Sequence, residues 1–199
     1  TLNYGYTGIL YANGNVIDDN VFWKFFSNGL NIYYFKNGAL YKANINTGEI
    51  TKILSDDSAY LYGIYRDKYL YYTSDKYTNL SWSMQDLIIY DLENNRELTY
   101  IADVGDFVMS DNKIYTKGAT GEIPKLTISE HNLDGTETKL VYEGSSYMKT
   151  IDNMLYFVSL QYLGGLYDFN SHKHQIKKYN SQTGEILALT DYQNGTPVD

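Results

Sequence analysis

The chain has 199 residues, among them 23 tyrosines, 16 glycines, two prolines and no cysteine. That length suits one domain with a sizeable core, and the lack of cysteine excludes disulfides and thiolate metal sites. The net charge is −8, and no basic cluster offsets it, so nucleic-acid binding and attachment to anionic membranes are disfavoured. No apolar run is long enough for membrane insertion as a spanning helix. Tyrosine favours strands, and glycine with asparagine favours tight turns, so the composition predicts an all-β fold.

Residues 1–20 are predicted to form an extended segment that contains an Asn-Gly turn. The stretch "TGILYANGNVIDD" (7–19) places that dipeptide between two apolar runs, a pattern typical of strand pairing. The chain begins with Thr1 rather than Met, so we expect a processed form or an excised piece, from which a signal peptide or anchor could have been removed.

Residues 21–190 contain four copies of one pattern. In each copy an aliphatic residue precedes a tyrosine within an apolar run, and successive aliphatic positions are separated by 38, 44 and 41 residues. The pairs are Ile32-Tyr33, Leu70-Tyr71, Ile114-Tyr115 and Leu155-Tyr156. A period of about 40 to 45 residues with several strands per copy is typical of a β-propeller blade. We therefore predict a β-propeller-like array of about four four-stranded antiparallel blades, whole or part of a larger ring. The predicted blades are 21–54, 58–102, 105–142 and 146–190.

Each predicted blade divides into four strands joined by short turns. The first strands are "VFWKFF" (21–26), "AYLYGIYR" (59–66), "GDFVMS" (105–110) and "SYMKTI" (146–151). The second strands carry the aliphatic–tyrosine pairs. The third strands end at Asn44, Asp91, Asn132 and Asn180. In the turns that follow, positive φ is expected at Gly48, Asn95, Gly135 and Gly184.

The apolar pattern also predicts the position of each strand within its blade. The runs "NIYYF" (31–35) and "MLYFV" (154–158) are apolar on both faces, as expected where stacked blades cover both sides. The fourth strand "EITKIL" (49–54) alternates polar and apolar residues, so it is predicted to be outermost. An alternative register makes 21–26 the second strand and moves 31–35 into a long connection, whereas short turns favour the first register.

These repeats resemble a bacterial β-propeller family of unknown function that is related to the YWTD propellers of the low-density-lipoprotein receptor. The stretches that carry the resemblance are "NIYYFKNGALYKANINTGE" (31–49), "DKYLYYTS" (67–74) and "NLDGTETKL" (132–140). The resemblance spans about residues 21–190 and implies a propeller fold, but it implies no catalytic residues. The YWTD tetrapeptide itself is absent from the sequence, and such propellers usually close with about six blades or more.

Neither the histidines nor the acidic pairs predict a metal site. His172 and His174 have a spacing that zinc can use, but no third ligand lies near them in the sequence, and His131 is distant. Asp18-Asp19 and Asp56-Asp57 lack the spacing of a calcium-binding loop. We therefore predict no metal and no cofactor.

Two long connections between second and third strands form the candidate ligand-binding site. They are residues 75–85 and 160–174, and both are rich in aromatic side chains. The aromatic candidates are Tyr77, Trp82, Tyr162, Tyr167 and Phe169. Exposed aromatic rings on loops suit sugar rings or peptides. The alternative is that these rings cap the blades or fill gaps between them.

The sequence therefore favours a non-catalytic propeller module that binds a protein, peptide or carbohydrate at the cell envelope or outside the cell. One alternative is a polysaccharide lyase or hydrolase with an axial active site, for which first-strand residues Tyr62, Arg66 and Lys149 are candidates. Another is a structural repeat module of a longer surface protein.

The ends of the array yield a last expectation. An uncovered blade face is a broad apolar surface, so an open ring is expected to self-associate through its blade faces unless further blades cover them. The segment 1–20 is expected to act as a ring-closing strand in the last blade. Residues 191–199 are predicted to begin a further strand or to form a tail.

Overall fold

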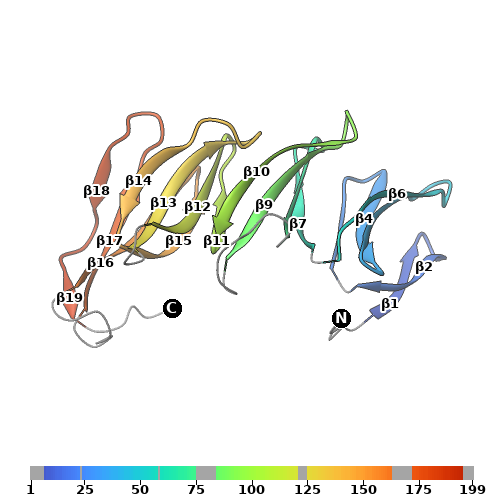
Figure 1. Cartoon of the computed structure of the whole chain (residues 1–199), viewed down its shortest axis with the longest axis horizontal. Helices are drawn as coiled ribbons and strands as arrows, with labels where there is room; N and C mark the ends of the chain where they lie inside the picture. Colours follow the sequence, from blue (N-terminus) through green and yellow to red (C-terminus); the bar gives the residue numbers. More distant parts are fainter. Residues whose placement is uncertain are drawn as a thin grey trace. The chain divides into compact units, whose positions relative to one another are not determined.

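The structure is a computed structural model that describes residues 7–22, 24–57, 59–74, 84–120, 125–162 and 172–194 (Figure 1). The described residues form antiparallel strands and contain no helix. The chain divides into two compact units, Thr1–Ala102 and Asp103–Asp199, and the boundary falls inside strand β10.

The first unit begins with a β-hairpin. Strand β1 (Thr7–Ala12) pairs with β2 (Asn15–Phe22) through a turn in which Asn13 and Gly14 have φ angles of 51° and 78°. Two consecutive positive φ angles are the requirement that Asn-Gly satisfies in a two-residue hairpin loop. The described part of segment 1–20 is therefore a two-stranded hairpin. Pairing of this segment into the last blade stays a prediction.

Two four-stranded sheets follow in the first unit. The first sheet contains β3 (Phe25–Ser27), β4 (Asn31–Lys36), β5 (Ala39–Asn44) and β6 (Ile50–Ser55), in that order. The second sheet contains β7 (Tyr60–Tyr65), β8 (Tyr69–Ser74), β9 (Gln85–Asp91) and β10 (Arg96–Val104). The alternative register is wrong, because residues 31–36 pair with strands on both sides instead of lying in a connection.

The first strand of the first sheet begins later than the sequence predicts. Val21 and Phe22 belong to β2, and β3 starts only at Phe25. The physical reason is that Val21 is buried with Leu10 of the hairpin, so the apolar run 21–26 serves two strands rather than one.

The second unit contains two further sheets. The third sheet contains β11 (Asp106–Met109), β12 (Lys113–Thr120), β13 (Lys125–Asn132) and β14 (Lys139–Glu143). The fourth contains β15 (Ser145–Ile151), β16 (Met154–Tyr162), β17 (His172–Tyr179) and β18 (Ile186–Ala188). A two-residue strand, β19 (Gln193–Asn194), pairs with β17 and so joins the fourth sheet instead of starting another. Four antiparallel sheets of this order confirm the predicted all-β, propeller-like fold.

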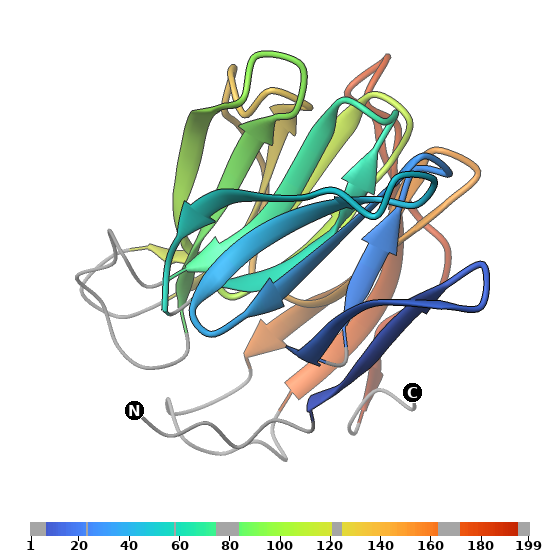
Figure 2. The same cartoon turned by 90° about the vertical axis from the view of Figure 1, so that its right-hand side faces the viewer.

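The first sheet is buried on both faces. Successive residues of a strand point to opposite sides, so Tyr34 lies on the face that packs against Leu10 and Val21 of the hairpin. Tyr33 and Phe35 lie on the other face, in a core shared with the second sheet. Figure 2 shows the hairpin, in dark blue, beside the first sheet. This arrangement confirms that "NIYYF" lacks a solvated side.

Burial in the other sheets follows the same logic. Strands β8 and β9 are buried along almost their whole length, whereas β6 and β14 are exposed or half-buried, as predicted for outermost strands. In the second unit the core between the third and fourth sheets contains apolar and aromatic side chains from both. Its buried members are Tyr115, Ile128, Leu155, Phe157 and Tyr179.

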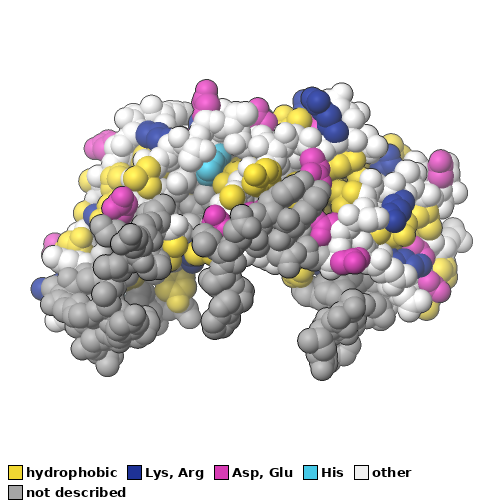
Figure 3. Space-filling view, viewed as in Figure 1, with side chains coloured by type: hydrophobic (Ala, Val, Ile, Leu, Met, Phe, Trp, Pro, Cys, Tyr) yellow, Lys and Arg dark blue, Asp and Glu magenta, His cyan; other side chains and the backbone are white. Residues whose placement is uncertain are grey.

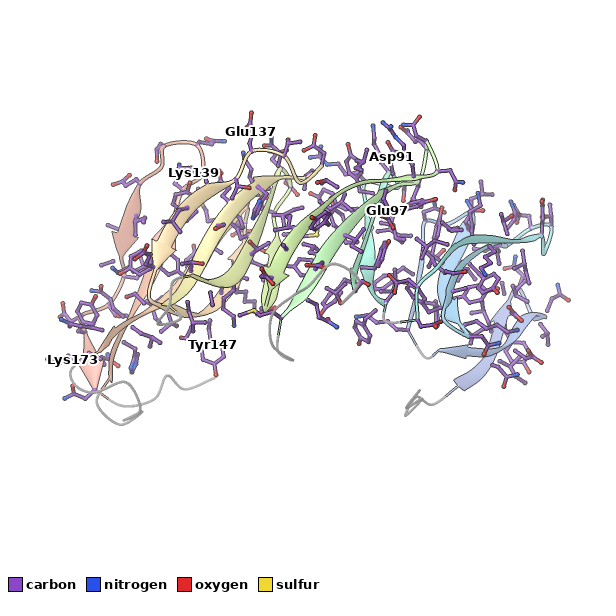
Figure 4. The ribbon with its side chains drawn as sticks, viewed as in Figure 1. Asp91, Glu97, Glu137, Lys139, Tyr147 and Lys173 are labelled. Atoms are coloured by element: carbon purple, nitrogen blue, oxygen red, sulfur yellow. The ribbon has the colours of Figure 1, made fainter. Side chains whose placement is uncertain are left out.

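The turns between third and fourth strands repeat one hydrogen-bonding scheme. In three sheets the side-chain oxygen of the residue at the end of the third strand, or directly after it, accepts hydrogen bonds from backbone amides two and three positions later. These residues are Asn44, Asp91 and Asn180, of which Asp91 is labelled in Figure 4. The predicted positive φ angles are confirmed at Gly48, Asn95, Gly135 and Gly184.

Candidate functional site

The aromatic residues predicted from the sequence to bind a ligand fall almost entirely outside the described residues. Tyr77 and Trp82 belong to the connection from β8 to β9, and Tyr167 and Phe169 to that from β16 to β17; none of the four is described. Tyr162 is the last residue of β16, where its backbone pairs with β17, but its side chain is also outside the described set. A ligand site on these connections stays a prediction.

A second group of aromatic side chains, in the first unit, surrounds a lysine. The Nζ atom of Lys24 lies 4.3 Å from the ring centroid of Tyr60 and 4.7 Å from that of Tyr62. The ring of Phe26 is the third neighbour, with its centroid 5.8 Å from the same nitrogen. We call these four residues the Lys24 cluster. A cation within about 6 Å of an aromatic centroid is attracted by the ring quadrupole, so three rings act on this one charge.

The cluster forms where the first strands of two sheets meet. Lys24 immediately precedes β3 and Phe26 lies within it, whereas Tyr60 and Tyr62 lie two positions apart on β7. Strands β3 and β7 are in contact, which brings the two pairs together. The rings of Tyr60 and Tyr62 are 5.4 Å apart at 72°, the edge-to-face geometry that aromatic pairs prefer.

Tyr62 lies in a β-bulge of β7. Leu61 pairs with Tyr72 and Gly63 pairs with Tyr71, so Tyr62 is the extra residue where the register shifts. Leu61 is 2% exposed in the core, whereas Tyr62 points to the other side of the strand and is 40% exposed.

Gly63 lies beside the third ring of the cluster. A Cβ atom added at this position would lie 3.6 Å from Cε1 of Phe26, an ordinary van der Waals distance, so the ring is next to Gly63 but does not require a glycine there. Phe26 also packs against the core shared by the first two sheets. The wall that Phe26 contributes is therefore held by the fold.

The charge of Lys24 is balanced by rings rather than by acids. None of the described residues forms an ion pair or a hydrogen bond with Lys24. By contrast, Lys36 pairs with Asp18 and Asp19. Lys139 contacts the ring of Tyr179 but also donates a hydrogen bond to its hydroxyl oxygen. Lys24 thus differs from both in being held by aromatic faces alone among the described groups.

The second unit presents a comparable first strand. The pairing of β15 with β16 shifts between Ser145 and Met148, and this bulge contains Tyr147, which is 56% exposed. In Figure 4 the ring of Tyr147 points away from the strands. Lys149 and Ile151 follow at alternate positions and are also exposed. A bulged tyrosine at the surface is therefore shared by the first strands of the second and fourth sheets.

The three residues that the sequence offered as axial catalytic candidates do not form one described group. Tyr62 is a member of the Lys24 cluster, whereas Arg66 lies in the turn after β7, where its guanidinium is 5.5 Å from the ring of Tyr65. Lys149 is exposed on β15 of the other unit.

Lys24, Phe26 and Tyr60 were not singled out from the sequence. The signals for them were a lysine inside the aromatic run "VFWKFF" and two tyrosines at alternate positions of a first strand.

His131 is a core residue. Its Nε2 atom lies 2.9 Å from Oγ1 of Thr116, and its Nδ1 atom lies 3.1 Å from Oγ1 of Thr138. Burial lowers the pKa of His131 to about 4, so the imidazole is neutral at pH 7. Both ring nitrogens are thus occupied by hydroxyls. Among the described residues, no three histidine, aspartate or glutamate side chains are grouped so as to hold a metal.

The surface of the described residues carries mixed charge. In Figure 3 acidic side chains, in magenta, and basic side chains, in dark blue, are interspersed with hydrophobic ones over the visible face. The described part of the chain contains no helix that is long and apolar enough to span a bilayer.

No family model and no curated protein matches the chain. Solved structures do match it. A prolyl endopeptidase structure aligns with a TM-score of 0.59 and 11% identity over 92% of this chain and 29% of its own. The β-propeller domain of the Trilobed protease from Pyrococcus furiosus, described as having an open velcro topology, aligns with a TM-score of 0.57 and 14% identity over 90% of this chain and 59% of its own.

A third similar structure is the N-terminal domain of Nup159, with a TM-score of 0.52 and 13% identity over 88% of this chain and 47% of its own. The chain thus spans less than two thirds of each of these structures. At such identities the likeness shows the fold alone, and that fold is the β-propeller.

Proposed function

We propose that the chain is a non-catalytic propeller module that binds a protein, peptide or glycan at the cell envelope or outside the cell. The observation that carries this proposal is the Lys24 cluster, in which a surface tyrosine of the first strand β7 lies beside a lysine that immediately precedes the first strand β3. Aromatic rings concentrate binding energy at interfaces because they offer a large contact area at a low entropic cost.

The chemistry of the cluster supports binding. Its groups are three rings, two phenol hydroxyls and one ammonium, which contact ligands by stacking, hydrogen bonding and cation–π attraction. His131 is buried between two threonines, and burial lowers its pKa to about 4, so it is neutral at pH 7. The described geometry therefore favours recognition over proton transfer.

The fold neighbours are compatible with this proposal but do not decide it. Two of them belong to peptidases, whereas Nup159 also appears in a structure of Dbp5 bound to it. The repeats "NIYYFKNGALYKANINTGE" and "NLDGTETKL" support membership of the bacterial propeller family that they resemble, and we include that membership in the proposal.

A binding screen tests the proposed function. The full chain is applied to cell-wall fractions, a glycan array and a peptide array, and each hit is measured again with Tyr62→Ala. We expect at least one ligand whose affinity falls by about tenfold or more in this variant, the size typical of an interface hot spot. A second variant, Trp82→Ala with Tyr167→Ala, asks whether the two long connections contribute.

Phe25→Ala is the matched control. Phe25 is 52% exposed and also lies on a first strand, but alternation places its ring on the opposite face of β3 from Phe26. It is expected to leave binding unchanged. Absence of any ligand in all three classes, or turnover of a polysaccharide in a lyase and hydrolase screen, would contradict the proposal.

A further inference from the structure

The Lys24 cluster has the form of an aromatic cage whose occupant belongs to the chain itself. We propose that this cage binds an organic ammonium group of a ligand, which displaces Lys24; the inference rests on the proposed function and names the chemical class of its ligand. Cages of aromatic rings recognise quaternary ammonium groups because the cation lies against several ring faces at once.

The walls of the cage are fixed on two sides and open on a third. Phe26 is packed against the core beside Gly63, and the ring of Tyr60 stands edge-to-face with that of Tyr62. Tyr62, which lies in the bulge, is 40% exposed and so borders the solvent. A ligand can therefore approach past Tyr62 without disturbing the core.

Lys24 is suited to be displaced. It lies between β2 and β3, outside both strands, and no described acid or hydrogen-bond acceptor holds its ammonium. Once it leaves the rings, a primary ammonium regains strong hydration from three N–H donors. Lys177, by contrast, lies 4.5 Å from the ring of Tyr142 and also donates a 2.8 Å hydrogen bond to its hydroxyl. That second bond makes Lys177 a poorer candidate for exchange.

The chemistry of the cage also determines which ammonium ligand is preferred. A trimethylated ammonium has no N–H donor and loses little hydration when it enters the cage, so it should bind more tightly than a primary amine. The net charge of −8 adds a general attraction for cations. The sources of such a group are a choline headgroup or a methylated lysine side chain.

A titration monitored by NMR of ring-labelled tyrosines tests the cage. Tetramethylammonium is added to the full chain and to Lys24→Ala, which empties the cage. We expect the Tyr60 and Tyr62 signals to shift in both, and the affinity of Lys24→Ala to be about tenfold higher, as removal of one internal cation–π competitor allows. Adding Tyr62→Leu to Lys24→Ala should lower that affinity again by about tenfold.

Lys178→Ala is the control for loss of charge, because Lys178 contacts a single ring, that of Tyr156, in the other unit. It should bind as the wild type does. Thermal unfolding verifies that each variant is folded, and Lys24→Gln replaces Lys24→Ala if the latter is not. Equal affinity of the wild type and the Lys24 variant, or shifts that persist unchanged without Tyr62, would overturn the inference.

Further titrations identify the source of the ammonium group and distinguish a failure of the cage from a failure of the proposed function. Choline, a trimethyllysine peptide and its unmethylated counterpart are titrated in the same way, and tighter binding of either full ligand than of tetramethylammonium identifies the source. Saturable binding of tetramethylammonium with a flat ligand screen supports the cage and contradicts only the proposed macromolecular ligand. A successful screen with no ammonium binding overturns only the cage.

Discussion

The hydroxyl of Tyr34 donates a 2.8 Å hydrogen bond to Oδ2 of Asp18 and so ties the N-terminal hairpin to the first sheet. Lys36 of the same sheet pairs with Asp18 as well, and with Asp19 at 3.0 Å. Burial raises the pKa of Asp18, but the hydrogen bonds from Lys36 and Tyr34 outweigh it, and the net pKa lies below the ordinary value. The ionised carboxylate thus stabilises the docked hairpin.

Replacement of Asp18 by Asn is expected to destabilise the chain by about 1–3 kcal/mol at pH 7, because a charged hydrogen-bonded group is lost. A carboxyl whose folded pKa is depressed contributes stability above its unfolded pKa and loses it as pH falls toward the folded value. The deficit of Asp18→Asn should therefore shrink below about pH 4. Urea unfolding of the wild type and Asp18→Asn at pH 7 and pH 3 measures this difference in stability. Asp19→Asn, at a side chain that is 68% exposed, is the control, and an equal deficit in both variants would contradict the role of Asp18.

The buried His131 predicts a second pH dependence. Its pKa of about 4 in the folded state lies below the unfolded value, so the unfolded chain takes up the proton first and stability falls as pH drops from about 6.5 toward 4. Between pH 7 and pH 5 the wild type should lose about 2 kcal/mol more than His131→Gln. Parallel stability curves for the two proteins would show that His131 does not titrate as expected.

Gly48 tests the repeated turn. Its φ is 72°, and an added Cβ would touch nothing within 4 Å, so Gly48→Ala should cost about 1 kcal/mol through backbone strain alone. Gly8 is the matched control, because its surroundings are equally open and its φ is not positive. Chemical unfolding should therefore separate the two alanine variants. If Gly8→Ala lowered the free energy of unfolding as much as Gly48→Ala, the positive φ of Gly48 would not be the cause of the loss.

Neighbouring residues of β1 test the packing of the hairpin. Leu10 is 5% exposed in the core against the first sheet, whereas Ile9 is 54% exposed. Leu10→Ala should destabilise by about 2–5 kcal/mol, and Ile9→Ala by about 0.5 kcal/mol or less. Thermal unfolding of both variants decides it. Similar losses would mean that the hairpin does not cover the first sheet as described.

The sheets could be predicted because their signals are local. In each repeat the aliphatic–tyrosine pair identifies the second strand. The turn glycine, or Asn95 in the second repeat, identifies the turn before the fourth strand. The start of β3 could not be predicted in this way. Whether Val21 belongs to β2 or β3 is decided by its contact with Leu10, which lies on another strand of the hairpin.

The candidate site was less accessible to prediction. Tyr62 could be named as a first-strand residue, but the bulge in which it lies depends on the register between β7 and β8. The meeting of Lys24 with Tyr60 depends on the packing of two sheets, which no local pattern encodes. The aromatic connections, by contrast, were chosen from composition alone, and their role stays a prediction.

A crystal structure of Lys24→Ala grown with tetramethylammonium tests the central claim, that the first strands of the first unit form a ligand site. We predict one ordered cation within about 6 Å of the ring centroids of Phe26, Tyr60 and Tyr62, where the ammonium of Lys24 lies in the wild type. An empty cage with the three rings in place would contradict the claim.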